Sequence, residues 1–147
     1  MLVVDTCVLI DIAENDPSFG RKSALCLAKY LDDDLVISPV SYVELAPVFG
    51  GMVRKLDEFL NGVGVRYDEL FELADREVAF VAWANHIAAK RSGNVRRRPI
   101  ADLLIGALVM RSQGIITRNG RDFASLFPDV RVIDPMRPKA PSSKSSR

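Results

Sequence analysis

The chain has 147 residues, of which 48% are hydrophobic and 27% are charged, and this length and balance are typical of one globular domain. They exclude a wholly disordered chain, a collagen-like repeat and, with only two cysteines, a small disulfide-rich scaffold. The net charge of +1 conceals an asymmetry, because residues 1–89 carry a formal charge of −8 and residues 90–147 one of +9.

The pattern of cysteine, histidine and apolar residues limits the compartment and the chemistry. Two unpaired cysteines, Cys7 and Cys26, fit a reducing cytosol, so we expect a cytoplasmic protein. The N-terminus lacks the basic start of a signal peptide, and no apolar run reaches the roughly 18 residues that a membrane span needs. The only histidine, His86, excludes two-histidine acid–base catalysis and a multi-histidine zinc site. We expect His86 to lie on a surface or an interface.

The hydrophobic periodicity predicts short strands that alternate with helices. In chain order we expect strand 2–4, helix 8–13, helix 18–32, strand 35–37, helix 40–49, helix 52–60, strand 63–67, helix 69–91, helix 100–111, strand 115–117, helix 122–126 and strand 130–133.

This alternation predicts an α/β fold in which a central, mostly parallel sheet has helices on both faces. We expect one domain over residues 1–135. Residues 136–147 are rich in Pro, Ser and Lys and have no apolar period, so we expect a disordered tail. In parallel sheets, sites form outside the carboxyl ends of the strands, so functional side chains are expected there.

Four acidic residues stand out by their surroundings. Asp5 follows the first strand and is the only charged side chain in residues 1–10. Glu44 is the only one between Asp34 and Arg54, and Asp102 the only one between Arg98 and Arg111. Burying a lone carboxylate is costly, and carboxylates that converge repel one another, so a divalent cation would resolve the conflict. An all-carboxylate set favours Mg²⁺ or Mn²⁺ over zinc or copper.

Asp122, which follows the strand 115–117, is the fourth acid of this set. Each acid also has a purely structural interpretation. Asp5 and Asp122 have the position of helix caps, and Asp102 lies in the first helical turn after Pro99, where an acid favours the helix dipole. Glu44 is expected in the middle of a helix, where a surface glutamate is common. The functional interpretation is preferred because all four lie where an α/β fold places a site.

The segments VVDTCVLID, ISPVSYVEL, PIADLLIGALV and IITRNGRDF, which contain these acids, resemble PIN-domain ribonucleases, and most closely the VapC-type toxins of VapBC toxin–antitoxin pairs. The resemblance implies a PIN-like domain, a Mg²⁺- or Mn²⁺-dependent endoribonuclease activity, a homodimer and inhibition by a cognate VapB-type antitoxin. It also implies that Asp5, Glu44, Asp102 and Asp122 form the acidic site. Many relatives have an acid where this chain has Asn119, so Asn119 shares the role of Asp122, and Thr117 supports the site through its hydroxyl.

In this interpretation a metal-activated water attacks a backbone phosphate. We expect Asp5 and Asp102 to be direct metal ligands, Glu44 to bind a second ion or to orient the water, and Asp122 to be a ligand or an outer partner. Whether one ion or two bind stays open.

Basic residues flank two of the acids and predict contacts with RNA phosphates. The alternatives are a solvated loop or a seat for an acidic segment of the antitoxin. The residues expected to contact RNA are Arg96, Arg97 and Arg98 before Asp102, with Lys90 and Arg91 at the start of the same loop, and Arg118 and Arg121 before Asp122.

Three other functions stay open at this stage: a PIN nuclease that matures RNA without an antitoxin, a Mg²⁺-binding receiver-like signalling module, and a catalytically inactive binding protein. Adjacent acids after the first strand are typical of the receiver, whereas Thr6 and Cys7 follow Asp5 here. The RNA target, the cleavage sequence and the identity of the antitoxin do not follow from the sequence.

Overall fold

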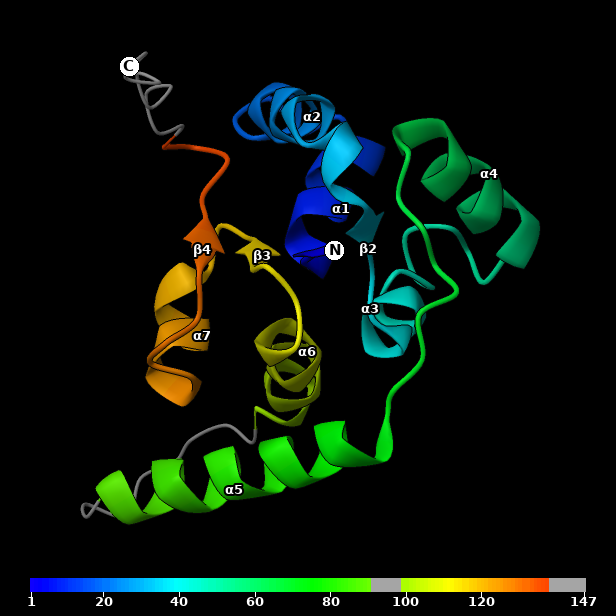
Figure 1. Ribbon diagram of the computed structural model, residues 1–147. Coiled ribbons are helices and arrows are strands. Elements are labelled where there is room, and N and C mark those ends of the chain that lie inside the picture. The colour runs from blue at the N-terminus through cyan, green and yellow to red at the C-terminus, as the bar shows by residue number, and fades with distance from the viewer. Residues whose placement is uncertain (91–98, 138–147) are drawn as a thin grey trace, which may run out of the picture.

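A computed structural model describes residues 1–90 and 99–137. Short parallel strands and the helices that follow them make up most of this part of the chain (Figure 1). The strands are β1 (Leu2–Val4), β2 (Leu35–Val36), β3 (Ile115–Ile116) and β4 (Val132–Ile133). The helices are α1 (Thr6–Ala13), α2 (Gly20–Lys29), the 3₁₀ turn η1 (Leu31–Asp33), α3 (Pro39–Glu44), α4 (Val53–Val63), α5 (Leu73–Ala89), α6 (Ile100–Met110) and α7 (Gly120–Leu126).

The sheet has the order β2-β1-β3-β4, and every neighbouring pair is parallel. Val3 of β1 lies opposite Val36 on one side and Ile115 on the other, so β1 is an inner strand. The expected parallel α/β sheet is confirmed. Because parallel strands end at the same edge, the residues after β1, β2 and β3 meet there.

Successive residues of β1 pack on opposite faces, which places helices on both sides of the sheet. Leu2 and Val4 join a core formed with α1, α2 and α4. Val3 points the other way, into a core with Ile105 of α6 and Phe123 of α7. All three strand residues are fully or almost fully buried.

A further layer is formed by α5, which packs on α6 and α7 rather than on the sheet (Figure 1). Ala79 and Ala82 of α5 are buried against Leu103 and Ala107 of α6 and against Phe127. Small side chains on both helices allow this close approach. No helix of the described residues has both the length and the apolar character that crossing a membrane requires.

The strand expected at 63–67 is wrong. α4 continues through the Asn61-Gly62 pair to Val63 and ends at Gly64, whose positive φ of 73° closes the helix. The chain then makes a single parallel bridge, from Arg66 to Val36, at the edge of the sheet.

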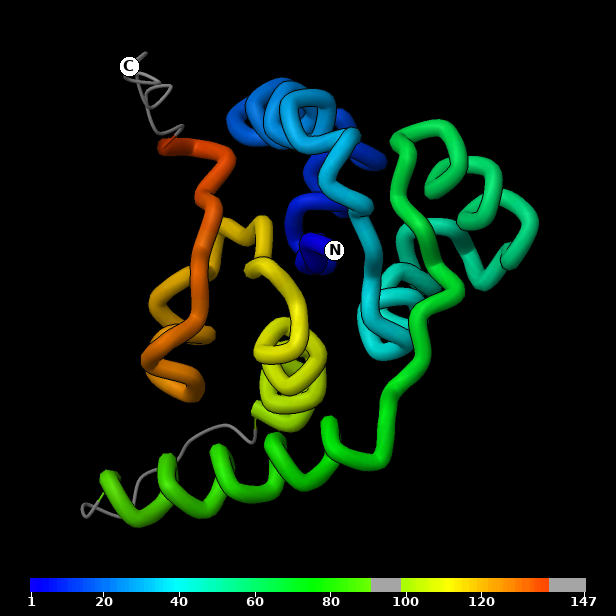
Figure 2. The backbone as a smooth tube through the Cα atoms, in the orientation of Figure 1, coloured from blue at the N-terminus to red at the C-terminus, as the bar shows by residue number. Residues whose placement is uncertain are grey.

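The helix expected at 69–91 is shorter, since α5 begins at Leu73. Glu72 and Asp75 form a capping box that fixes this start. The preceding segment runs extended past α3 (Figure 2) because Glu69 pairs with Arg66 and Arg111. Arg91 lies outside the described residues.

The expected tail lies partly within the described residues. Met136 is half-buried, and its backbone N–H donates to the Asp134 carboxylate at 2.9 Å. The prediction of a tail beginning at residue 136 is not tested further, because residues 138–147 lie outside the described part.

We predict that Gly106→Ala destabilises the fold although alanine favours helices. A Cβ at Gly106 would meet the ring of Phe127, so overpacking of about 1–3 kcal/mol outweighs a helix gain of about 1 kcal/mol. Gly62→Ala in α4 is the matched control, because a Cβ there meets nothing. Urea unfolding should show Gly62→Ala to be stabilised and Gly106→Ala to be destabilised, and the opposite order would contradict this packing.

Candidate active site

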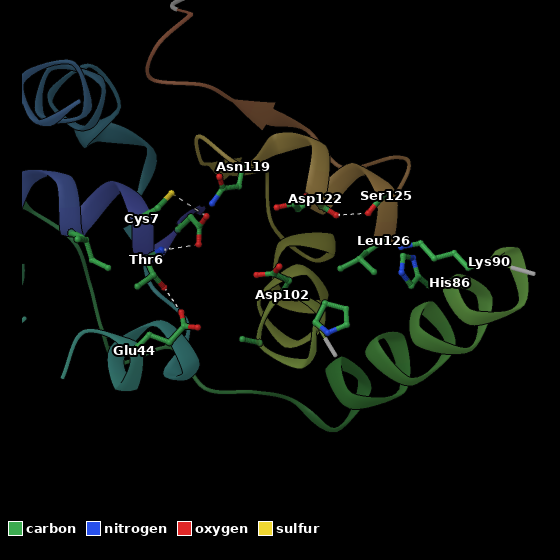
Figure 3. Close-up of a pocket in the computed structure, with 14 residues that line it drawn as sticks. Thr6, Cys7, Glu44, His86, Lys90, Asp102, Asn119, Asp122, Ser125 and Leu126 are labelled. Carbon is green, nitrogen blue, oxygen red and sulfur yellow. Dashed lines mark hydrogen bonds between the residues drawn. The ribbon is translucent and has the colours of Figure 1, made fainter. Parts of the chain in front are cut away.

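A cavity of about 730 Å³ opens at the carboxyl edge of the sheet (Figure 3). α1 and α3 border one end, α5 and α7 border the other, and α6 lies between them. The cavity brings together all four acids selected from the sequence. Its lining includes Asp5, Glu44, Asp102 and Asp122, together with Thr6, Cys7, Asn119, His86, Lys90 and Ser125.

Asp5 is the most buried of the four acids, with only 5% of its surface exposed. It ends β1 and caps α1, and its Oδ1 accepts the backbone N–H of Thr6 at 2.8 Å. Its Oδ2 accepts the hydroxyl of Thr117 at 2.6 Å and lies 3.3 Å from the thiol of Cys7. The capping role and the site role therefore coexist, because the cap fixes the direction of the carboxylate.

Glu44 is joined to the Asp5 region through Thr6. The Thr6 hydroxyl donates to Glu44 Oε2 at 2.5 Å, which Figure 3 shows as a contact between α1 and α3. α3 starts at Pro39, where the Ser38 hydroxyl accepts the Ser41 N–H, and it ends at Glu44. The expected mid-helix position is wrong: Glu44 is the last residue of a short helix, and its exposed side chain faces the cavity.

Asp102 and Asp122 come from the first turns of α6 and α7. Asp102 is half-buried and Asp122 is exposed, and both line the middle of the cavity (Figure 3). The structural interpretation of Asp122 as an N-cap is wrong, because the N-cap of α7 is Asn119. First-turn acids are favoured by the helix dipole, which explains their tolerance there but not why both face one cavity.

Thr117 and Asn119 connect β3 to this site. Thr117 is fully buried, and its hydroxyl accepts the backbone N–H of Asn119 at 2.9 Å while it donates to Asp5. The Asn119 side chain lines the cavity. One hydroxyl therefore fixes both the Asp5 carboxylate and the loop that precedes α7.

Cys7 lines the cavity but is not suited to nucleophilic attack. Burial, reinforced by the negative charge of Asp5, raises the pKa of the Cys7 thiol to about 12. The thiol is therefore protonated at neutral pH, and the thiolate is the nucleophilic form.

His86 and Lys90, both in the C-terminal part of the α5 region, line the cavity. Lys90 is among the basic residues expected near the site, whereas the sequence interpretation gave His86 only a surface or interface position. Figure 3 places both near Asp122 and Ser125. The signal was present, because His86 lies four residues after the buried Ala82 and Lys90 four residues after His86, which is the spacing of one helical face.

Of the arginines expected to bind RNA, the described ones do not line the cavity. Arg118 forms an ion pair with the buried Asp11, at 2.6 and 3.0 Å. Arg121 is exposed and belongs to the first turn of α7. Arg96, Arg97 and Arg98 lie outside the described residues.

The donor set of the cavity fits a hydrated divalent cation. Its acidic residues offer carboxylate oxygens, the ligands that Mg²⁺ and Mn²⁺ prefer over nitrogen and sulfur. Within residues 1–90 and 99–137, no three His, Cys, Asp or Glu side chains lie close enough together to ligate one ion jointly. Mg²⁺ usually keeps several of its waters and binds one or two carboxylates directly, so the remaining acids would act through water.

We predict that Thr117→Val destabilises the protein more than Thr117→Ser. Valine preserves the size of the side chain but leaves Asp5 Oδ2 and the Asn119 N–H without this partner, at a cost of about 1–3 kcal/mol. Serine keeps both hydrogen bonds and loses one methyl group, worth about 1 kcal/mol. Thermal unfolding of the two variants gives the order, and a more stable valine variant would refute the role assigned to the hydroxyl.

Two solved structures resemble the chain in fold. One is a chain of FitAB bound to an IR36 DNA fragment, with 14% sequence identity and a TM-score of 0.71, and the match covers 97% of this chain and all of that chain. The other is a chain of FitAcB from Neisseria gonorrhoeae, with 18% identity and a TM-score of 0.67, and the match covers 93% of this chain and 99% of that one. At these identities the likeness shows the fold alone.

Comparison with curated proteins finds no match. The family model of the PIN domain matches residues 2–126, which include every acid of the cavity. The chain therefore belongs to the PIN domain family.

Proposed function

We propose that this protein is the toxin of a type II toxin–antitoxin system and that it cleaves RNA as a Mg²⁺- or Mn²⁺-dependent endoribonuclease. The observation that carries the proposal is the convergence of Asp5, Glu44, Asp102 and Asp122, from four separate segments, on one cavity. PIN domains are nucleases, so membership of the family supports hydrolysis of a phosphodiester bond.

The acids divide into those that would hold the ion and those that would orient the water. When bound, Mg²⁺ or Mn²⁺ lowers the pKa of a water molecule and offsets the negative charge that grows on the phosphate. Asp5 and Asp102 would hold this ion. Glu44 and Asp122 would hold a second ion or accept the protons of the attacking water.

The opposite end of the cavity supports binding of a polyanion. His86 and Lys90 supply basic groups there, and RNA phosphates are attracted to such groups. This placement puts the carboxylates at the reacting phosphate and the basic side chains at a neighbouring one. No histidine is needed to activate the nucleophile in such a reaction.

Exposed apolar side chains support the proposal that the protein binds protein partners. Leu73, Phe80 and Val81 of α5 are each more than half exposed, as are Val43 and Val53. Contiguous apolar patches commonly mark interaction surfaces, and Leu73 and Phe80, seven residues apart, lie on one face of α5. The structural neighbours come from FitAB and FitAcB complexes, which supports assembly with an antitoxin, and the apolar surface also accommodates a homodimer.

We predict that Asp5→Asn and Asp102→Asn each lower RNA cleavage by about 100-fold or more while the fold is retained, because each loses a carboxylate proposed to bind the ion. Cleavage of RNA would be measured with Mg²⁺, with Mn²⁺ and with a chelator. Asp129→Asn, which changes an exposed acid outside the cavity, is the control and should cleave normally. Full activity of either site variant at saturating Mg²⁺ would refute the assignment.

We predict that Lys90→Ala and His86→Ala weaken RNA binding across sequences without changing the affinity for Mn²⁺. If Lys90 contacts one phosphate, the slope of log affinity against log salt should fall by about 0.7 in Lys90→Ala. Lys29→Ala, which removes a lysine outside the cavity, should leave the slope unchanged. An unaltered slope in Lys90→Ala would show that its ammonium group stays in solvent.

A further inference from the structure

We propose that the Asp11–Arg118 ion pair is a positioning device that fixes the Asp5 carboxylate for metal binding. This inference rests on the proposed function, since it assigns Asp5 to the ion. It also gives Arg118 a role different from the RNA contact expected from the sequence. The device acts from outside the cavity, because neither Asp11 nor Arg118 belongs to its lining.

The ion pair is built as a rigid contact. The Arg118 guanidinium donates from Nε to Asp11 Oδ2 at 2.6 Å and from Nη2 to Asp11 Oδ1 at 3.0 Å, a bidentate arrangement. Asp11 is 4% exposed, and the Ser23 hydroxyl donates to it at 3.5 Å. The guanidinium carbon lies 4.0 Å from the centre of the Phe19 ring. The Nε and Nη2 groups of the guanidinium are therefore bound by Asp11, and one of its faces is covered by Phe19.

Phe19 is itself held in place beneath Arg118. The Asp16 carboxylate accepts the backbone N–H groups of Ser18 and Phe19, each at 2.8 Å. Asp16 in turn donates its own N–H to the carbonyl of Asp11 at 2.9 Å. The turn between α1 and α2 thus positions the Phe19 ring so that it contacts the same arginine, Arg118, that pairs with the Asp11 carboxylate.

Two neighbouring side chains of one loop hold α1 at two points. Thr117 hydrogen-bonds to Asp5 at the start of α1, and Arg118 pairs with Asp11 six residues further along the helix. At a rise of 1.5 Å per residue these points are about 9 Å apart along the axis. The start of the loop is also fixed by the sheet, because the Asp5 N–H donates to the Ile116 carbonyl and the Thr117 N–H donates to the Ile133 carbonyl, each at 3.0 Å. The Arg118 contact adds a point of attachment further along α1, which limits rotation of α1 relative to the loop.

The chain contains a matched ion pair that lacks this connection. Arg111 donates to the buried Asp75 at 2.9 Å, and the arginine side chains of the two pairs are equally exposed, at 25%. Arg111 lies at the end of α6 opposite Asp102 and joins α6 to the start of α5. Arg111 also pairs with Glu69 and donates to the Leu70 carbonyl, so breaking its contacts should cost at least as much stability without disturbing Asp5.

The test compares Arg118→Gln, Asp11→Asn and the double variant with Arg111→Gln. Titration calorimetry measures the affinity for Mn²⁺, and NMR records the amide signals of Thr6 and Asn119, whose N–H groups contact Asp5 and Thr117. We expect each Arg118 or Asp11 variant to bind Mn²⁺ about 10-fold more weakly, the usual effect of losing an outer partner of a metal ligand. Arg111→Gln should stay within about twofold of the unmodified protein.

The double variant keeps the test informative if Arg118→Gln, which leaves Asp11 unpaired, fails to fold. Because the two residues act as one unit, their effects should not add. The double variant should therefore bind Mn²⁺ at least as tightly as the weaker-binding of the single variants that fold. Mn²⁺ affinity within twofold of the unmodified protein in the double variant, with an unshifted Thr6 amide, would overturn the proposal. Weaker RNA binding with unchanged Mn²⁺ affinity would also overturn it and return Arg118 to an RNA contact.

Failure of the proposed function gives a different result. If the unmodified protein binds no Mn²⁺, the metal-dependent activity is wrong, and the positioning role is then decided by the amide signals. A shift of Thr6 in the Arg118 and Asp11 variants, and of Asn119 in Asp11→Asn, both absent in Arg111→Gln, would still support positioning of Asp5. Unshifted signals would overturn it.

Discussion

The burial of the Asp5 carboxylate at the end of β1 is the constraint on which the rest of the structure depends. A buried charge is tolerated only when hydrogen-bond donors surround it, and here the donors come from the first turn of α1 and from Thr117 after β3. β1 and β3 must therefore be neighbours in a parallel register, as Val4 opposite Ile116 shows. The need to supply hydrogen-bond donors to the buried Asp5 carboxylate thus links the residues at the sheet edge to the order of the strands.

The sequence was sufficient for features that depend on local pattern. The apolar run at Leu2–Val4 and the isolation of Asp5, Glu44 and Asp102 identified the central strand and the acids of the cavity. The sequence was insufficient where contacts between distant residues determine the local conformation or the partner of a side chain. Arg66 and Arg111 keep the chain before α5 extended, and no local signal shows that Arg118 pairs with Asp11, which is 107 residues away.

The charge asymmetry of the chain has a structural origin as well as a functional one. Arg111, from the basic part of the chain, neutralises acids of the N-terminal part, among them Glu69 and Asp75. These pairs are partly exposed, so each contributes modestly to stability, but together they fix the segment that leads into α5. The acids of the cavity belong to a separate group at the sheet edge, in which Asp5 is buried, Asp102 is half-buried, and Glu44 and Asp122 are exposed.

The two ends of the cavity depend on different arginine–aspartate pairs. The end of the cavity that contains Asp5 lies next to the loop in which Arg118 pairs with Asp11 of α1. The basic end belongs to the α5 region, whose helix is joined to α6 through Asp75 and Arg111. The pairs share no residue, and effects of substitutions at independent sites usually add. If the proposed function is correct, affinity for the cation and affinity for a polyanion can therefore change separately, because substitutions near one end leave the ion pair at the other end intact.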